Sequence, residues 1–395
     1  MITAARADTN PSSASVSRSA RVVGIVGGGQ LARLAVPAAR KLGIELRVLD
    51  PNTDGPAARA GLHVVAGQFD DASALRRLVE QCDVTTFETE SVDVDVLVEL
   101  ADAGHTIVPH PRLMRQLTNK LDQKRLLRSL GLPVPDFAEL TSPTINGVRA
   151  FGLPAVLKRQ RGGYDGRGVL VIHHDHSERD LWQQQSLVEE YLRDVIELAV
   201  LVARTADGET RAYPVAEMVF AADHALDYLV VPAQQPALTI RAAEALAVRT
   251  VCAIGGVGLF AVELFLTRDG RLLINEIAPR AHNSGHYTIE ACMTSQFEQH
   301  LRAVTGQPLG SVDLLRPAAM INLVGSPGYR GGTIVEGLDE AVRQRDVAVH
   351  LYEKRECWPG RKMGHITALG DSAEAALQTA RAAAGQIRIR GSARL

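Results

Sequence analysis

The chain has 395 residues, of which 46% are hydrophobic and 22% are charged, and its net charge at pH 7 is −2. This length predicts two to three domains, and the composition is typical of a soluble globular protein. The near-neutral charge argues against a general nucleic-acid-binding surface, and no segment is apolar for long enough to span a membrane. Four scattered cysteines without a C-x-x-C pair indicate buried thiols in a reducing cytoplasm.

Residues 1–20 are rich in Ser, Ala and Arg, and we expect them to form a disordered tail. Over residues 21–117, short apolar runs alternate with helical patterns, which predicts a parallel α/β domain. The turn Gly27–Gln30 follows the first expected strand and fits G-x-G-x-x-A, with Asp50 at the end of the next strand. This pattern suits a dinucleotide, a phosphate-bearing substrate or a plain tight turn, because any helix N-terminus offers amides to an anion.

The middle of the chain predicts a helix over residues 119–130, ended by Gly131, and then mainly strands. The glycine-rich segment Arg161–Gly168 lies between two apolar runs, directly after Lys158. Its four glycines would let backbone amides fold over a polyphosphate while the lysine supplies charge; the alternative is a flexible surface hairpin. Downstream, S-L-V-E-E-Y and Glu197 could bind an adenine edge and a ribose, or form a solvated strand end.

A hairpin over residues 260–277 carries a pair of acidic side chains. Its two apolar runs meet at Asp269-Gly270, which favours a two-residue loop. Counting outward from that loop places Glu263 opposite Glu276 on one face of the sheet. Two carboxylates among apolar side chains need a cation between them, and paired oxygen ligands suit Mg²⁺ that carries substrate phosphates. The alternative is a carboxylate exposed at a sheet edge.

The segment that follows this hairpin, residues 278–286, is polar. Pro279 and Gly285 argue against a helix there. His282 and His286 would converge on a metal only from a helix, so we expect a loop that lines a substrate site.

From about residue 315, short strands and an Ala-rich helix predict a small closing domain. Within it, residues 352–365 carry several cations around Pro359-Gly360, including Lys354 and Arg361. Such a cluster suits a phosphate ester, although a solvated charged loop is the alternative.

The order of Lys158, G-G-Y-D-G-R-G, V-E-E-Y, Glu263, N-E-x-A-P-R, H-N-S-G-H and P-G-R-K-M-G-H resembles the 5-(carboxyamino)imidazole ribonucleotide synthetases of bacterial and fungal purine synthesis. The likeness runs from about Val22 to the last expected helix. It implies an ATP-grasp architecture that combines α/β and α+β parts. The implied domains are an N-terminal parallel α/β domain (21–117), a two-lobed ATP-binding domain (118–314, small lobe about 155–215) and a small C-terminal domain (315–395).

The resemblance also implies roles for individual residues. Magnesium, as one or two ions, is expected on Glu263 and Glu276. The residues expected to bind ATP are Lys120, Lys158, Gly163, Tyr164, Asp165, Gly166, Arg167, Gly168, Glu189, Glu190, Tyr191, Leu192, Glu197, Asn275 and Glu276. Catalytic roles are expected for Arg280, His282, Asn283 and Asp165. Substrate contacts are expected for Gln30, Glu88, Glu90, Arg167, Lys354 and Arg361. Met218 and Phe220 replace Asn and His that are frequent in the family, so the resemblance gives them no role.

The implied reaction begins with phosphorylation of bicarbonate by ATP, which gives carboxyphosphate. The carboxyl group then passes to the exocyclic amine of 5-aminoimidazole ribonucleotide, and ADP and phosphate leave. Phosphoryl transfer needs metal and cations that neutralise charge more than it needs a covalent nucleophile, and the predicted residues suit this. The expected partners are these small molecules, without nucleic acid or membrane, in a cytoplasmic homodimer.

Three alternatives compete with this function. Another ATP-grasp ligase could use the same architecture on a different carboxylate or amine. An NAD-linked oxidoreductase could use the turn at Gly27, but it leaves the pair Glu263 and Glu276 unexplained. A non-catalytic nucleotide-binding module needs no second anion site around Lys354. Turnover of ATP that depends on both bicarbonate and the ribonucleotide would separate them.

Overall fold

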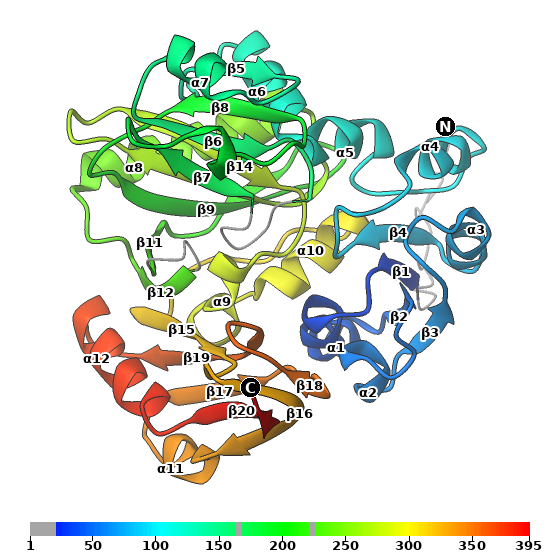
Figure 1. Ribbon diagram of the computed structural model, residues 1–395. Coiled ribbons are helices and arrows are strands. Elements are labelled where there is room, and N and C mark those ends of the chain that lie inside the picture. Colours follow the sequence, from blue (N-terminus) through cyan, green and yellow to red (C-terminus); the bar gives the residue numbers. More distant parts are fainter. Residues whose placement is uncertain (1–20, 163–167, 222–225) are drawn as a thin grey trace, which may run out of the picture.

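The computed structural model describes residues 21–162, 168–221 and 226–395, and its arrangement is shown in Figure 1. The N-terminal part of this described chain forms a parallel sheet in the order β3-β2-β1-β4. Its strands are β1 (Val22–Val26), β2 (Glu45–Asp50), β3 (His63–Ala66) and β4 (Val84–Phe87). Its helices are α1 (Gln30–Leu42), α2 (Pro56–Arg59), α3 (Ala72–Glu80) and α4 (Val94–Asp102). The predicted parallel α/β region is confirmed.

Two helices, α5 (Pro111–Thr118) and α6 (Lys120–Ser129), lead into a second, antiparallel sheet. The predicted helix over residues 119–130 corresponds to α6. Asn119 caps it, because its side chain accepts from the amides of Leu121 and Asp122. The sheet has the order β5-β8-β6-β7. Its elements are β5 (Phe137–Leu140), α7 (Ile145–Phe151), β6 (Ala155–Arg159), β7 (Val169–Ile172), η1 (Glu178–Asp180) and β8 (Ser186–Glu190).

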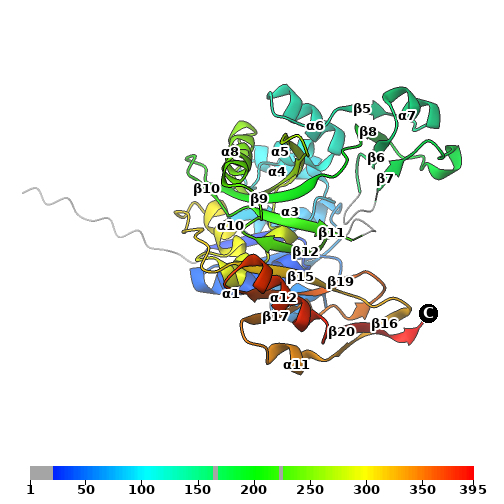
Figure 2. The same cartoon turned by 90° about the vertical axis from the view of Figure 1, so that its left-hand side faces the viewer.

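The largest sheet in the described chain has the order β14-β13-β9-β11-β12-β15-β19-β17, with β10 paired to β9. Its strands are β9 (Ile196–Arg204), β10 (Thr210–Ala212), β11 (Ala216–Phe220), β12 (Leu226–Val231), β13 (Gly258–Leu266), β14 (Leu272–Ala278), β15 (Ala318–Val324), β17 (Val347–Leu351) and β19 (Lys362–Leu369). Figure 2 shows the strands β9, β11, β12, β15, β19 and β17 following one another down the molecule in this order. The predicted small lobe, 155–215, therefore overlaps the antiparallel four-stranded sheet only in part, because β9 pairs in the largest sheet.

The C-terminal part continues the largest sheet through the pairing of β12 with β15. A further small sheet has the order β18-β16-β20. Its strands are β16 (Tyr329–Glu336), β18 (Glu356–Cys357) and β20 (Arg388–Arg394). The remaining helices are α8 (Ala237–Ala253), η2 (Asn283–Gly285), α9 (Thr288–Ala291), α10 (Gln296–Val304), α11 (Leu338–Val342) and α12 (Ala373–Ala384). The largest sheet thus contains paired strands from both sides of the predicted domain boundary at residue 315.

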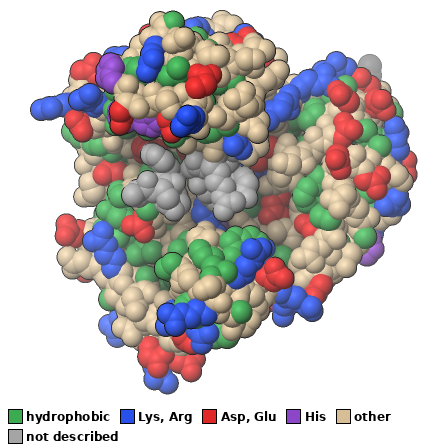
Figure 3. Space-filling view, in the orientation of Figure 1, with side chains coloured by type: hydrophobic (Ala, Val, Ile, Leu, Met, Phe, Trp, Pro, Cys, Tyr) green, Lys and Arg blue, Asp and Glu red, His purple; other side chains and the backbone are tan. Residues whose placement is uncertain are grey.

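Apolar cores fill the spaces between these layers. Helix α8 packs against the largest sheet, where Leu246 and Val251 meet Phe260 and Ile274. A separate core, which includes Val148 and the strands β6 and β8, lies under the four-stranded sheet. No helix of the described residues is both long and apolar enough to cross a membrane. On the face shown in Figure 3, positive and negative side chains are interspersed.

Candidate active site

A cavity of about 420 Å³ lies between the four-stranded sheet and the largest sheet. One wall is apolar, with side chains from strands of both sheets, including Val156, Val171 and Phe265. The predicted site residues that line the cavity are Lys120, Lys158, Glu189, Glu190, Tyr191, Leu192, Glu197, Glu263, Asn275, Glu276, His282 and Asn283. The structure therefore gathers side chains from seven separate segments, and the cavity has one apolar and one charged side.

The hairpin of β13 and β14 places Glu263 opposite Glu276, as the sequence predicts. The predicted two-residue loop is wrong. Thr267 donates to the carbonyl of Arg271 and accepts from the amide of Gly270, which closes a three-residue loop with Gly270 at φ +85°. A bulge at Asn275 then shifts the register by one residue, because Leu264 pairs with Ile274 while Glu263 pairs with Glu276. The two deviations cancel, so the predicted pair survives.

The two carboxylates differ in their surroundings. Burial and the neighbouring Glu276 raise the pKa of Glu263 to about 8. The Glu276 carboxylate is also buried, but its ion pair with Lys120 holds its pKa below the ordinary value. His282 adds a second neighbour, since its Nε2 lies 3.5 Å from Glu263 Oε1. Glu263 can ionise beside Glu276 only at a cost, and a bound cation would remove that cost, so the pair fits a cation site.

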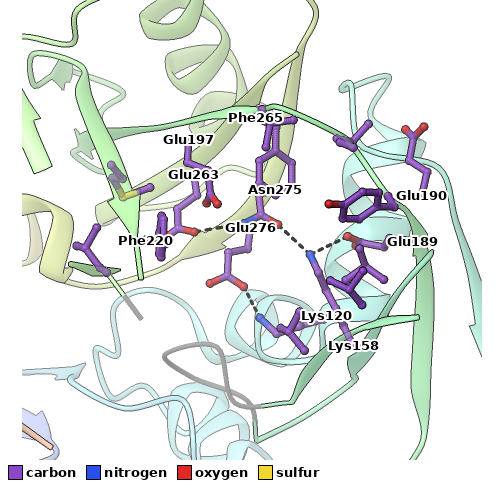
Figure 4. Close-up of a pocket in the computed structure, with 18 of the residues that line it drawn as sticks. Lys120, Lys158, Glu189, Glu190, Glu197, Phe220, Glu263, Phe265, Asn275 and Glu276 are labelled. Carbon is purple, nitrogen blue, oxygen red and sulfur yellow. Dashed lines mark hydrogen bonds and ion pairs between the residues drawn. The ribbon is translucent and has the colours of Figure 1, made fainter. Parts of the chain in front are cut away.

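Lys158 joins the carboxylate pair to the four-stranded sheet. Its Nζ donates to Asn275 Oδ1 at 2.9 Å and forms an ion pair with Glu189 Oε2 at 2.7 Å. The bulge aims the Asn275 amide at this lysine, and the amide's Nδ2 donates to Glu263 Oε2 at 3.4 Å. Figure 4 shows these side chains converging from β6, β8, β13 and β14. The network holds one ammonium at the charged side of the cavity.

The loop after β14 carries the predicted catalytic residues. His282 and Asn283 line the cavity, and Asn283 begins the short turn η2. Arg280 does not line it; its Nε donates to Glu90 Oε1 at 2.8 Å, which ties this loop to the N-terminal domain. The Glu90 carboxylate thus holds Arg280 in the structure, and its expected contact with the substrate stays a prediction. His286 is buried and its Nδ1 lies 2.9 Å from Gln296 Nε2.

The glycine turn before α1 is bonded by carboxylates of the chain itself. The Glu88 side chain accepts from the amides of Gly29 at 2.7 Å, Leu31 at 3.0 Å and Ala32 at 3.3 Å. Asp50 Oδ2 accepts from the amide of Gly28 at 2.8 Å. These four amides are thus already paired within the chain, which favours the plain tight turn over an anion site.

This arrangement also affects two predicted substrate contacts. Glu88 was expected to contact the substrate, but both of its carboxylate oxygens accept from amides at the N-terminus of α1. Gln30 is the first residue of that helix and does not line the cavity.

The two predicted phosphate-binding cations lie apart from the main cavity. Lys354 Nζ donates to the carbonyl of Lys362 at 2.8 Å and lines a second pocket of about 430 Å³ beside Arg59. Arg361 Nη1 donates to the carbonyl of Glu356 at 2.6 Å, and its guanidinium lies 3.8 Å from the centre of the Trp358 ring. The cation of this segment that does line the main cavity is Lys362.

Several predicted residues fall outside the described residues, namely Gly163, Tyr164, Asp165, Gly166 and Arg167, and the predicted disordered tail does so too. Gly168 is described: its φ is +83°, and its carbonyl accepts from the amide of Arg159 at 2.9 Å. It therefore closes the base of the predicted glycine-rich hairpin, where only glycine adopts such a φ without strain.

Sequence reasoning gave no specific role to several residues in or beside the cavity, of which four bear on its chemistry. Met218 and Phe220 on β11 line the cavity, although the sequence gave them no role because they depart from the family pattern. Lys362 was treated only as part of a cationic cluster. Lys124 is buried and lies 3.1 Å from Glu189 Oε1. The rarity of lysine in this chain, which has six, singles out Lys124 and Lys362 as residues that the chemistry could require, but a random scarcity of lysine explains them equally well.

Family models match three consecutive parts of the chain. Residues 20–117 match the ribonucleotide synthetase preATP-grasp domain, and residues 125–297 match the ATP-grasp domain. Residues 318–379 match the phosphoribosylaminoimidazole carboxylase C-terminal domain. The fold and the site together therefore define an ATP-grasp enzyme, an ATP-dependent ligase that forms ADP.

Individual relatives narrow this class. The chain is 41% identical to the N5-carboxyaminoimidazole ribonucleotide synthase of Synechococcus elongatus, over 87% of this chain and 88% of the relative. It is similar to the crystal structure of N5-carboxyaminoimidazole ribonucleotide synthetase from Thermotoga maritima, with a TM-score of 0.86, 39% identity, and coverage of 94% of this chain and 100% of that one. The Aspergillus clavatus structure in complex with ADP and 5-aminoimidazole ribonucleotide has a TM-score of 0.83 and 34% identity, covering 93% and 99%.

This chain belongs to the N5-carboxyaminoimidazole ribonucleotide synthase family. The resemblance of its sequence motifs to this family is confirmed, as is the predicted ATP-grasp architecture.

Proposed function

We propose that the protein carboxylates the exocyclic amine of 5-aminoimidazole ribonucleotide, using ATP and bicarbonate, in purine biosynthesis. The observation that carries this function is the cavity between two sheets in which Glu263 and Glu276 face Lys120 and Lys158. Paired carboxylates and ammoniums in one cavity suit a magnesium-bound polyphosphate, and few other small molecules require both charges together. The products are the N5-carboxyamino ribonucleotide, ADP and phosphate.

ATP would lie with its base against the apolar wall and its phosphates towards the lysines. The segment Glu190–Leu192 leaves strand β8 at the cavity, where its backbone can pair with the adenine edge. Phe265, Met218 and Phe220 offer apolar surface to the flat base. Glu197 lies near Lys158, and burial raises its pKa to about 7; its carboxyl group could exchange a hydrogen bond with a ribose hydroxyl in either protonation state.

Magnesium would be held by Glu263 and Glu276, with phosphate oxygens and water completing its shell. When bound, it neutralises the charge that develops on the transferred phosphoryl group. The pKa of Glu263, raised by burial and by Glu276, supports this assignment, because a cation there would let both carboxylates ionise. Lys120 already pairs with Glu276, so it would share that carboxylate with the cation and reach the phosphates.

The loop after β14 would bind the carboxyl donor. His282 and Asn283 line the cavity beside the carboxylate pair, where they can orient bicarbonate for attack on the terminal phosphorus. Arg280 does not line the cavity; its Nε donates to Glu90 and its Nη1 to the carbonyl of Ala281, and these bonds would hold the loop in place for the anion. Phosphoryl transfer gives carboxyphosphate, which then loses phosphate as its carboxyl group passes to the amine nitrogen. No covalent bond to the protein is needed at any step.

The ribonucleotide would enter between the cavity and the N-terminal domain. Asp165 and Arg167, from the predicted glycine-rich hairpin, would contact it, and Gln30 lies on the facing domain. Lys354 and Arg361 would bind its 5′-phosphate; both are hydrogen-bonded to carbonyls of their own segment, which holds this cationic segment in shape.

Domain limits near residues 117 and 314 are proposed with this function, as are a cytoplasmic location and a homodimer. Four free thiols support a reducing compartment. Light scattering tests the homodimer, since a monomer mass at micromolar concentration would exclude it.

The function is tested by ADP release from the purified protein with magnesium, ATP, bicarbonate and 5-aminoimidazole ribonucleotide. We expect rapid release with the complete mixture and a large loss when either bicarbonate or the ribonucleotide is omitted. Substitution of other amines for the ribonucleotide distinguishes a different ligase of the same architecture. Equal ADP release with an unrelated amine, and none with the ribonucleotide, would exclude the proposed function.

A further inference from the structure

Helix α6 covers the edge of the largest sheet through polar side chains. Strand β14 ends the strand order, so one side of its backbone has no strand partner among the described residues. Gln123 Oε1 accepts from the amide of Ile277 at 2.8 Å, and Gln123 Nε2 donates to the carbonyls of Ile277 at 3.1 Å and Leu117 at 2.8 Å. Lys120, one turn earlier, pairs with Glu276. One face of α6 therefore bonds the strand that carries the acidic pair.

Lys124 lies on the same face and is almost completely buried, with 2% of its surface exposed. Its Nζ donates to the carbonyl of Ile274 at 3.2 Å and lies 3.1 Å from Glu189 Oε1. A buried ammonium is costly unless it is paired and hydrogen-bonded, and here it has both kinds of partner. These partners lie on different sheets, because Ile274 is on β14 and Glu189 is on β8.

The carboxylate of Glu189 is shared between two lysines. Its Oε1 faces Lys124, and its Oε2 lies 2.7 Å from the Nζ of Lys158. Glu189 is itself only 2% exposed, so water cannot replace either partner. Lys158 reaches the cavity, whereas Lys124 does not line it. Lys124 is therefore placed behind the site and touches it only through Glu189.

We propose that Lys124 is a positioning residue: it fixes the Glu189 carboxylate, and through Glu189 it sets the place and the availability of the Lys158 ammonium. This role rests on the proposed function in one respect, namely that Lys158 contacts the phosphates of ATP. With Lys124 in place, Glu189 has a second cation, so the Lys158 ammonium can also donate a hydrogen bond to a phosphate. Without it, the buried carboxylate has Lys158 as its one remaining lysine partner and draws that ammonium away from the nucleotide.

The electrostatics of the group agree with this arrangement. Burial lowers the pKa of Lys124 to about 8, against the opposing influence of Glu189. Burial alone would raise the pKa of Glu189, but the two lysines reverse this and hold it below its ordinary value. Each charge in the group affects the others, so removal of one charge should shift the pKa values of the remaining groups.

The test compares variants by calorimetric titration with Mg-ADP and by steady-state kinetics. Lys124→Met keeps the length of the side chain without its charge, and Lys124→Gln keeps a hydrogen-bond donor for the carbonyl of Ile274. Arg125→Met is the matched control, because Arg125 lies next on the same helix but pairs with Glu139 at the surface. We expect a tenfold or greater loss of ADP affinity and a similar rise in the KM for ATP in both Lys124 variants. The KM for the ribonucleotide should change less than twofold, and the control should match the wild type.

A double-mutant cycle separates positioning from mere packing. If Lys124 acts through Glu189, then Lys124→Met combined with Glu189→Gln should weaken ADP binding no more than Glu189→Gln alone. Additive losses would overturn the proposal, as would wild-type ADP affinity in both Lys124 variants. Loss of folded structure in both variants, seen by circular dichroism, would overturn it in favour of a purely structural role. A wild-type protein that binds no ADP would overturn the proposed function as well, so the two failures are distinguishable.

Discussion

Replacing Glu263 with Gln should stabilise the metal-free protein, and increasingly so as the pH rises through neutrality. Burial and Glu276 raise the pKa of Glu263 from 4.5 to about 8. Because the folded-state pKa lies above the unfolded value, the stability from the protonated group is complete below pH 4.5 and is lost as the pH rises through 8. Within this window the folded protein holds more protons at this site than the unfolded chain does. Gln cannot titrate, so the variant escapes that loss.

The size of this change in stability follows from the one extra proton that the folded protein binds at Glu263. A difference of one bound proton lowers the free energy of unfolding by up to about 1.4 kcal/mol per pH unit, and so by up to about 3 kcal/mol from about pH 5.5 to about pH 7.5. Urea denaturation with a chelator at constant ionic strength measures it, with Glu139→Gln as a surface control. The difference in unfolding free energy between the Glu263 variant and the wild type should widen with pH, while the control shows no such trend. Parallel pH dependences of variant and wild type would refute the reasoning.

Three further predictions concern the apolar wall of the cavity, the glycine turn before α1 and the ribonucleotide site. Phe220→Ala should raise the KM for ATP several-fold without affecting the ribonucleotide, because it removes apolar surface from the cavity; equal changes in both KM values would contradict this. Glu88→Ala should lower the melting temperature, since three amides of α1 lose their acceptor at a cost of about 1–3 kcal/mol, and an unchanged thermal melt would exclude it. Lys354→Ala and Arg361→Ala should each raise the ribonucleotide KM roughly ten- to a hundredfold, as expected for charge-assisted bonds of about 1.5–3 kcal/mol. Kinetics with each substrate varied separately would contradict this if only the ATP KM changed.

Local patterns predicted the parts of the site that lie within one hairpin or one segment. The pairing of Glu263 with Glu276 follows from alternation along two short strands, and it holds although the loop has three residues. The bulge at Asn275 could not be predicted from the alternation along the strands, and its contact with Lys158 joins segments that lie far apart in the sequence. The bulge lies between the loop and Glu276, so its shift of one residue offsets the shift that the three-residue loop introduces.

Contacts between distant segments could not be predicted in this way. The turn at Gly27 has the sequence of an anion site, but its anion is Glu88, a side chain some sixty positions along the chain. Nothing in either segment alone indicates this pairing, since any acidic residue near the N-terminus of α1 would serve. Lys124 is similar: the helical pattern places it on α6, but only the packing of α6 between two sheets shows that it is buried against Glu189.

The proposed chemistry is tested most directly by following labelled atoms into the product. The protein would be given ATP, magnesium, ¹³C-bicarbonate and ribonucleotide labelled with ¹⁵N at the exocyclic amine, and the mixture followed by NMR alongside ADP release. The account predicts a ¹³C carbamate signal split by ¹⁵N, which appears in step with ADP and is absent without ATP. Release of ADP at the same rate without the ribonucleotide, with no ¹³C–¹⁵N bond formed, would contradict it.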